Sequence, residues 1–137
     1  LRDRSPLPIA AGEGECGRES FRALIDRHAL DVYQVDLSRN GFTDAAYIRD
    51  RVEEIGARLC NHCYTSPITV AASAHWLSTC RDAFLLEDCV EDEPLRNELT
   101  LERVQAVDGT ITVPDGPGLG VTLNEDFVAA HLVSESR

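Results

Sequence analysis

Four short apolar runs recur along the first part of the chain, and a polar residue closely follows each of them. The runs occupy residues 8–11, 32–35, 58–61 and 83–86. The polar residues are Glu13, Asp36, His62 and Glu87. They stand about 25 residues apart, which is the length that a strand, a helix and two turns require in a βα unit. The pattern therefore predicts four parallel strands. One ionisable group lies at the carboxyl end of each, where parallel α/β proteins carry out their chemistry.

The segments between the runs predict helices. Residues 18–27 place four side chains on one helical face: Phe21, Leu24, Ile25 and His28. Thr43 is the expected N-cap of the next helix, with Asp44 in its first turn. The buried stripe of that helix is Ile48, Val52 and Ile55, and Gly56 is expected to end it. Residues 68–77 predict a third helix, rich in small residues that suit close packing on a sheet.

The pattern changes after the fourth unit. Residues 91–94 predict a solvated acidic loop, and residues 114–120 hold too many prolines and glycines for regular structure. Residues 106–113 predict a small hairpin around an Asp-Gly pair. Asn124 is the expected cap of a last helix, whose apolar side chains are Phe127, Val128 and Leu132.

The composition excludes some classes of function. The chain has 137 residues, the length of one ordinary domain, and a formal net charge of −11. Its basic residues are all Arg, and no basic patch offsets the acidic field, so nucleic-acid binding is not expected. No stretch approaches the roughly 18 apolar residues of a membrane helix, so no membrane span is expected. An acidic chain without Lys is typical of adaptation to high salt, although a GC-rich genome also exchanges Lys for Arg.

The five cysteines predict free thiols. Their number is odd and no secretion signal precedes the first strand, which favours a reducing cytoplasm. The chain does not begin with Met, and residues 1–5 resemble a helix end entered from further upstream. These features favour a segment of a longer cytoplasmic protein.

The four strand-end groups suggest proton transfer. Neighbouring parallel strands bring their carboxyl ends together, so Asp36 and His62 are expected within hydrogen-bond reach. A carboxylate that accepts from one imidazole nitrogen raises the basicity of the other, which makes a general base. Glu13 is a hard oxygen ligand suited to Mg²⁺, and Glu87 is placed to contact a substrate oxygen. Together these groups suit abstraction of a proton next to a carboxylate.

Each assignment has a structural alternative. A lone His at a strand end is more often structural than catalytic. Asp36 fits a cap of the following turn, Glu13 a loop carboxylate facing water, and Glu87 one more charge in an acidic stretch. Their joint placement, once per unit, favours the functional interpretation.

Five motifs in order carry a family resemblance. They are Pro8-Ile9-Ala10-Ala11-Gly12-Glu13, Tyr33-Gln34-Val35-Asp36 with Gly41-Phe42-Thr43, Asn61-His62, Leu85-Leu86-Glu87, and Asp108-Gly109 followed by residues 113–121. Over residues 6–132 the chain resembles the carboxyl-terminal part of the enolase superfamily. The similarity is to its mandelate racemase/muconate lactonizing enzyme family, and within it to the acid-sugar dehydratases. The chain departs from the pattern at Asn40-Gly41, where two glycines are usual, although Asn tolerates a positive φ.

The resemblance implies an α/β fold, namely strands five to eight of a (β/α)₇β barrel of the TIM type. Residues 1–103 would belong to the barrel, and residues 104–137 would form a tail that reaches the capping domain. By the same resemblance Glu13 is a ligand of Mg²⁺, and Asp36 and His62 are the general-base dyad. Glu87, with His62, binds the substrate carboxylate or its enediolate.

The resemblance also implies partners. The other metal ligands, the opposite base and the specificity loops belong to an amino-terminal half barrel and capping domain outside these residues. Four strands cannot close an eight-stranded barrel, so the segment alone is expected to be inactive. At full length we expect a homo-oligomer that acts on a small carboxylate. The expected reaction is dehydration of an acid sugar, and racemisation or epimerisation is the alternative within the family.

Two other classes stay open. Cys60 and Cys63 form a Cys-x-x-Cys pair between a strand and a helix, which resembles a thioredoxin-like redox motif. Zinc binding by these two with Cys80 and Cys89 is less favoured, because the second pair lacks ligand spacing. An inactive or degenerate half barrel is the non-catalytic alternative.

Overall fold

A computed structural model describes residues 2–133 of the chain. Its strands are β1 (Ala10–Ala11), β2 (Val32–Asp36), β3 (Arg58–His62) and β4 (Ala83–Leu85). A single 3₁₀ turn, η1, covers Arg2–Arg4. The helices are α1 (Arg18–Ile25), α2 (Leu37–Glu54), α3 (Pro67–Leu77), α4 (Pro94–Glu98) and α5 (Glu125–Ala130). Strands and helices alternate through α3, as the hydrophobic pattern predicts. None of the described helices is long and apolar enough to cross a membrane.

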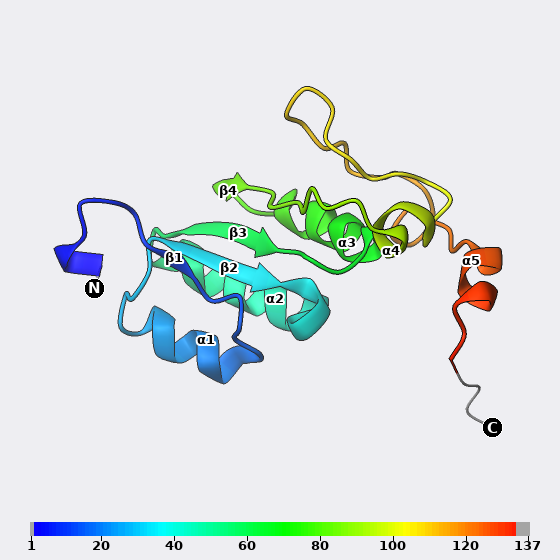
Figure 1. Cartoon of the computed structure of the whole chain (residues 1–137). Coiled ribbons are helices and arrows are strands. Elements are labelled where there is room, and N and C mark those ends of the chain that lie inside the picture. Colours follow the sequence, from blue (N-terminus) through cyan, green and yellow to red (C-terminus); the bar gives the residue numbers. More distant parts are fainter. Residues whose placement is uncertain (1, 134–137) are drawn as a thin grey trace.

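The four strands form one parallel sheet in the order β1-β2-β3-β4. In Figure 1 the arrows of β2 and β3 lie side by side and point toward the side occupied by α4 and α5. The register between these two strands pairs Asp36 with His62 at their last residues. The parallel α/β architecture is therefore confirmed, and the carboxyl ends share one edge of the sheet.

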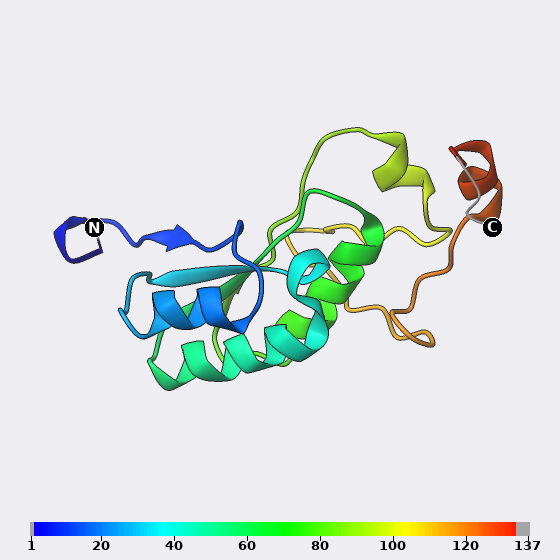
Figure 2. The same ribbon diagram turned by 90° about the horizontal axis from the view of Figure 1, so that it is seen from below.

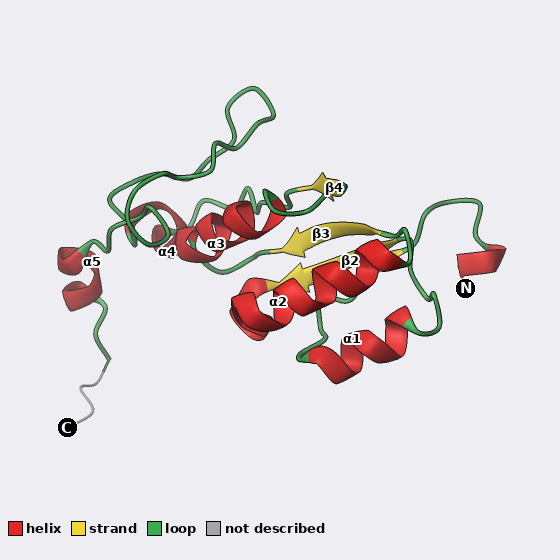
Figure 3. Cartoon of the chain, turned by 180° about the vertical axis from the view of Figure 1, so that it is seen from behind, coloured by secondary structure: helices red, strands yellow, loops and turns green. Residues whose placement is uncertain are grey.

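Helices cover a single face of this sheet. Figures 2 and 3 show α1, α2 and α3 on the same side of the strands. The core between the layers contains Phe21, Tyr33, Ile48, Leu59 and Trp76, each at most 2% exposed. Burial of one such side chain stabilises the fold by about 1.5–3 kcal/mol. The indole Nε1 of Trp76 also donates to the carbonyl oxygen of Ala45 at 3.1 Å, which ties α3 to α2.

The opposite face of the sheet carries the polar side chains at the strand ends. Side chains alternate along a strand, so Tyr33 and Val35 enter the helical core while Gln34 and Asp36 point to the other face. On β3, Leu59 faces the core and His62 the other side.

The edges of the sheet are short and exposed. Strand β1 has two residues, and all three residues of β4 are exposed, with Phe84 46% and Leu85 47% accessible. A complete barrel has no edge strands, so exposed edges are the mark of an open sheet. The expected half barrel, open on both sides, agrees with this arrangement.

The start of α2 adds one turn to the expected helix. This first turn begins at Leu37, because the carboxylate of Asp36 accepts from the backbone N–H of Ser38 and caps it, and the main part of the helix begins after a kink at Gly41, close to the expected start at Thr43. The chain then leaves helical geometry at Gly41, whose φ of 61° favours glycine, and resumes the helix beyond it. Asn40 is helical, so the Asn at this position needs no positive φ.

Other departures lie at element ends. His28, expected on the buried face of α1, follows the helix with φ 46° and is exposed, because α1 ends at Ile25. The expected hairpin is reduced to one isolated bridge between Val107 and Thr110. A short helix, α4, follows the acidic loop. The last helix is confirmed, with Asn124 Oδ1 accepting from Phe127 N–H, although Leu132 lies beyond its end.

The segment after α4 packs back on the helices. Leu119 contacts the core cluster, and its carbonyl oxygen lies 3.2 Å from His75 Nε2 of α3. The division into a barrel part (1–103) and a tail (104–137) stays a prediction, and residues 134–137 lie outside the described part of the chain.

Candidate active site

Asp36 anchors the site at the end of β2. Its side chain is 4% exposed, and its Oδ1 accepts from the backbone N–H and the hydroxyl of Ser38 at 2.8 and 2.6 Å. Burial raises the pKa of Asp36. The hydrogen bonds from Ser38 and His62 outweigh that effect, so the pKa lies below its usual value of 3.8. Asp36 is therefore a carboxylate in the folded protein.

The other oxygen of this carboxylate contacts His62. Oδ2 of Asp36 lies 3.1 Å from Nδ1 of His62, as expected from their adjacent positions in the sheet. An Nδ1–H that donates to Asp36 leaves a lone pair on Nε2. The structural alternative for Asp36 is also present, because the same carboxylate caps α2 with its first oxygen. Asp36 thus holds both the helix start and the imidazole.

Glu87 reaches the site from beyond the end of β4. Its backbone N–H donates to Asn61 Oδ1 at 2.7 Å, and its carbonyl oxygen accepts from Asn61 Nδ2 at 3.0 Å. Its carboxylate Oε2 accepts from Gln34 Nε2 at 2.9 Å. The second oxygen, Oε1, is buried without a hydrogen-bond partner and lies 4.0 Å from His62 Nε2.

Glu13 lies on the other side of the imidazole. Its Oε2 is 3.9 Å from His62 Nε2, and its side chain is 59% exposed. Within residues 2–133, no three His, Cys, Asp or Glu side chains are grouped to hold a metal ion by themselves. The exposed carboxylate of Glu13, which follows the edge strand β1, is a suitable oxygen ligand for Mg²⁺ if other segments supply the remaining ligands.

The structure thus brings together all four groups singled out from the sequence. Nδ1 of His62 contacts Asp36, while Nε2 faces the space between Glu13 and Glu87. That arrangement suits a general acid or base in which Nε2, the nitrogen that exchanges the proton, lies between two carboxylates. The roles of the four residues stay a proposal.

Sequence reasoning overlooked three contributors. Asn61 and Gln34 hold Glu87, and the ring of Tyr64 lies 5.2 Å from that of His62, centre to centre. Gln34 had a usable signal, because a residue two positions before Asp36 on a strand shares its face. Tyr64 had none, since it lies in the turn after β3.

The cysteine pair has features unlike a redox motif. Cys60 and Cys63 are buried free thiols, and burial raises the pKa of both, that of Cys60 to about 11. Reactive thiols have lowered pKa values and are partly exposed. Cys60 also belongs to β3 itself rather than to the turn before α3. These observations weigh against thiol–disulfide exchange.

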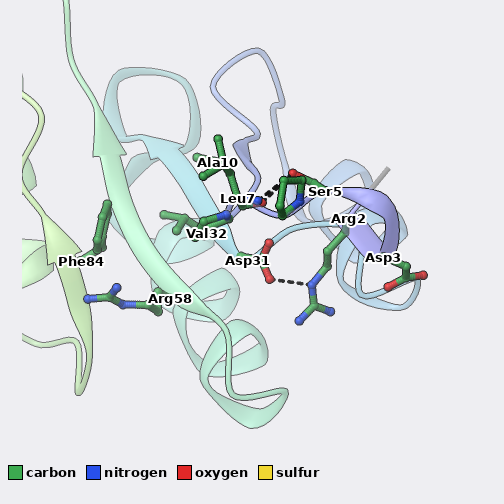
Figure 4. Close-up of a pocket in the computed structure, with 11 residues that line it drawn as sticks. Arg2, Asp3, Ser5, Leu7, Ala10, Asp31, Val32, Arg58 and Phe84 are labelled. Carbon is green, nitrogen blue, oxygen red and sulfur yellow. Dashed lines mark hydrogen bonds and ion pairs between the residues drawn. The ribbon is translucent and has the colours of Figure 1, made fainter.

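A cavity of about 720 Å³ lies at the opposite end of the strands (Figure 4). Val32 and Arg58, the first residues of β2 and β3, line it, and Arg2 donates to Asp31 at 2.7 Å on its rim. None of the four strand-end groups lines it. The cavity is therefore separate from the candidate site.

Comparison with known proteins gives a consistent result. The sequence profile of the family described as "Enolase C-terminal domain-like" matches residues 1–127. The chain is 28% identical over 135 residues to D-galactarolactone cycloisomerase of Agrobacterium fabrum. The alignment covers 92% of this chain and 36% of that protein. It is 32% identical over 135 residues to D-galactonate dehydratase of Pectobacterium atrosepticum, covering 93% of this chain and 35% of that protein.

Solved structures give the same picture. A mandelate racemase/muconate lactonizing enzyme from Jannaschia sp. CCS1 superposes with a TM-score of 0.84 at 30% identity, covering 97% of this chain and 34% of that chain. The 3,6-anhydro-D-galactonate cycloisomerase of Zobellia galactanivorans gives a TM-score of 0.88 at 27% identity, covering 97% and 38%. The chain therefore spans about a third of the length of the proteins that it matches.

Proposed function

We propose, since this chain belongs to the enolase C-terminal domain-like family, that it contributes part of an active site that removes the α-proton of a hydroxy-carboxylate. The observation that carries the proposal is the contact between Asp36 and His62, with Nε2 of His62 facing two carboxylates. The substrate we favour is an acid sugar, and the reaction we favour is its dehydration.

His62 supplies the proton-transfer group. Its Nδ1–H donates to Asp36 at 3.1 Å, so the ring is held in one tautomer and Nε2 is free to accept a proton. The positive charge that then develops on the ring is stabilised by the adjacent carboxylate. Proton transfer by a positioned side chain contributes about 10²–10⁴-fold to a rate.

Glu87 supplies a contact to the substrate. Its free Oε1 lies 4.0 Å from His62 Nε2, so an oxygen bound between them contacts both groups. A carboxyl group that carries a proton can donate to the substrate carboxylate and to the enediolate that replaces it. The enediolate carries more charge, so this contact favours the transition state.

Glu13 is the residue of this chain that would hold Mg²⁺. Its exposed carboxylate follows β1 at the open edge, where further ligands from preceding strands can meet it. Members of the enolase superfamily are generally Mg²⁺-dependent. The ion would supply positive charge that stabilises the substrate anion after loss of the proton.

Dehydration is favoured by the names of the relatives. D-galactonate dehydratase of P. atrosepticum is 32% identical and D-xylonate dehydratase of Haloferax volcanii is 31% identical over 127 residues. In such a reaction the α-proton and the β-hydroxyl leave together as water, and the resulting enol becomes a 2-keto acid. If a base outside this chain removes the α-proton, His62 must enter the reaction with both ring nitrogens protonated; it would then give the Nε2 proton to the departing hydroxyl, which leaves as water, and become neutral.

A second function in the same site is isomerisation. The similarity to two cycloisomerases favours it, and racemisation or epimerisation uses the same proton abstraction. In racemisation His62 is one of two opposed bases. The other base, and the loops that select the substrate, are expected outside residues 1–137. We therefore expect the segment alone to be inactive.

The test uses the full-length protein with Mg²⁺ and a panel of acid sugars that includes galactonate and xylonate. Incubation in deuterated water detects α-proton exchange, and a keto-acid assay detects dehydration. We expect exchange with at least one substrate and none with His62→Asn. Absence of both exchange and product over the whole panel would refute the proposal.

A further inference from the structure

We propose that Gln34 is a positioning residue: it holds the carboxyl group of Glu87 so that Oε1 alone faces the substrate. This inference rests on the proposed function, because Glu87 is taken to contact the substrate. It adds a residue to the site that neither the motif spacing nor the similarity to known enzymes assigns.

The contact spans three strands. Gln34 is on β2, two residues before Asp36, and its register partner on β3 is Cys60. Glu87 follows β4, on the far side of β3. Neighbouring strands lie about 4.8 Å apart, so the two side chains must bridge roughly 10 Å across β3. The hydrogen bond from Gln34 Nε2 to Glu87 Oε2, at 2.9 Å, closes that gap.

The backbone of Glu87 is fixed separately. The regular pairing of β3 with β4 ends at Cys60 and Leu85, with an irregularity in its register. Beyond that point the side chain of Asn61, which is fully buried, bonds both the N–H and the carbonyl oxygen of Glu87. The remaining freedom of Glu87 is rotation of its side chain, and Gln34 removes it.

The chemistry of the amide determines which oxygen works. An amide N–H can only donate, so Oε2 of Glu87 accepts from Gln34, and Oε1 is the oxygen left for another partner. Oε1 is buried, unpartnered and 4.0 Å from His62 Nε2, which is beyond hydrogen-bond distance. The imidazole and the carboxyl group are thereby kept apart, at a separation that one oxygen hydrogen-bonded to both would span. A neutral Gln does this without adding charge beside the dyad.

The experiment is a double-mutant cycle in the full-length protein, with the acid sugar that the parent turns over fastest. We expect Gln34→Leu to lower kcat at least about 10-fold with KM within about 3-fold, because the contact to Glu87 matters most in the transition state. Glu87→Gln is expected to lower kcat further. The double variant Gln34→Leu/Glu87→Gln should be as slow as Glu87→Gln, since Gln34 acts through Glu87.

Two further variants separate positioning from general support. The exchange Gln34→Glu/Glu87→Gln restores an amide–carboxylate hydrogen bond in reverse and should recover thermal stability, but not kcat. Gln105→Leu removes an exposed Gln of the tail and should leave kcat unchanged. Three results would each overturn the inference. They are losses in kcat that multiply independently in the double variant Gln34→Leu/Glu87→Gln, a parental kcat in Gln34→Leu, and recovery of kcat in the exchange variant.

The same variants distinguish this inference from the proposed function. If the parent shows no proton exchange on the panel, the function is refuted, and the contact is then judged by the melting temperatures of the cycle. If the double variant loses less Tm than the two single variants lose in sum, the result supports a direct interaction of Gln34 with Glu87. Additive losses in Tm contradict it.

Discussion

Replacement of Asp36 separates the two tasks that the structure gives to one carboxylate. Oδ1 caps α2 through Ser38, and Oδ2 holds His62 at Nδ1. Asp36→Asn keeps the shape and leaves an oxygen for the cap, because Asn caps helices as well as Asp does. Its amide nitrogen then faces Nδ1. The ring must accept there and carry its proton on Nε2, where it can no longer act as a base.

The Asn and Ala variants are expected to lose different amounts of stability. In Asp36→Asn the three charge-assisted hydrogen bonds, two from Ser38 and one from His62, become neutral ones, which are about half as strong, so we expect a loss of roughly 1–2 kcal/mol in the free energy of unfolding. Asp36→Ala also loses the cap, about 1 kcal/mol, and leaves the largely buried Nδ1 of His62 unpaired, about 1–3 kcal/mol. We therefore expect about 3 kcal/mol for Ala. In a catalytic Asp–His pair of another fold, the wrong tautomer lowers kcat about 10⁴-fold, and we expect a loss of about 10²–10⁴-fold here.

The assays are thermal unfolding of the full-length protein and α-proton exchange in deuterated water. Asp44→Asn is the control, because Asp44 forms a surface ion pair with Arg18 at 2.7 Å, with both side chains a third or more exposed. Such pairs contribute about 0–1 kcal/mol. Exchange by Asp36→Asn within 10-fold of the parent would refute the dyad. Equal stability of the Asn and Ala variants would refute the separation of capping from positioning.

Four further outcomes are expected. His62→Asn should reduce exchange by at least about 10²-fold without loss of Tm beyond a few degrees, and parental turnover would contradict its role. Because the pKa of Asp36 is lowered in the folded state, the stability from its ionised form is present above pH 3.8 and lost as the pH falls through its lowered folded value. Asp36→Asn should lack this step in an acid titration followed by circular dichroism, and an unchanged acid midpoint would argue against it. At pH 8 iodoacetamide should modify the exposed Cys16 well before Cys60, because burial raises the pKa of Cys60 to about 11, and modification of Cys60 first in mass spectrometry of the peptides would contradict this. Chelation with EDTA should abolish exchange until Mg²⁺ is added, and Glu13→Gln should need a higher Mg²⁺ concentration for half-maximal rate; a rate independent of Mg²⁺ would contradict the ligand assignment.

The two central strands, β2 and β3, could be predicted because the residues that mark each of them are contiguous in the sequence. Each is a short apolar run that a polar residue ends, and the runs 32–35 and 58–61 with Asp36 and His62 match the strands Val32–Asp36 and Arg58–His62. Parallel pairing then brings the strand ends together, so the contact between Asp36 and His62 follows from the spacing. The edge strands are shorter than expected because each lacks a neighbour on one side.

Errors arose where one residue serves two purposes or where packing is absent. Asp36 both caps α2 and contacts His62, so the first turn of α2, from Leu37 to the kink at Gly41, does not show in the apolar stripe that begins further on. The Val107–Thr110 turn bends as its Asp-Gly pair dictates, but nothing buries a strand beside it, so a hairpin does not form. Pro94 at the first position of α4 was a usable signal for that helix.

The placement of chemical groups on separate units has a consequence for divergence. Glu13, Asp36, His62 and Glu87 stand on four different βα units, while the side chains that stabilise each unit point into the helical layer. A substitution at an exposed strand end such as Glu13 is therefore expected to change one proposed role with little effect on folding, whereas Asp36, which also caps α2, is an exception. If the proposed function holds, the reaction type can change by single substitutions in such a scaffold, and variants that alter one strand end at a time are the library with which to seek activity on a new acid.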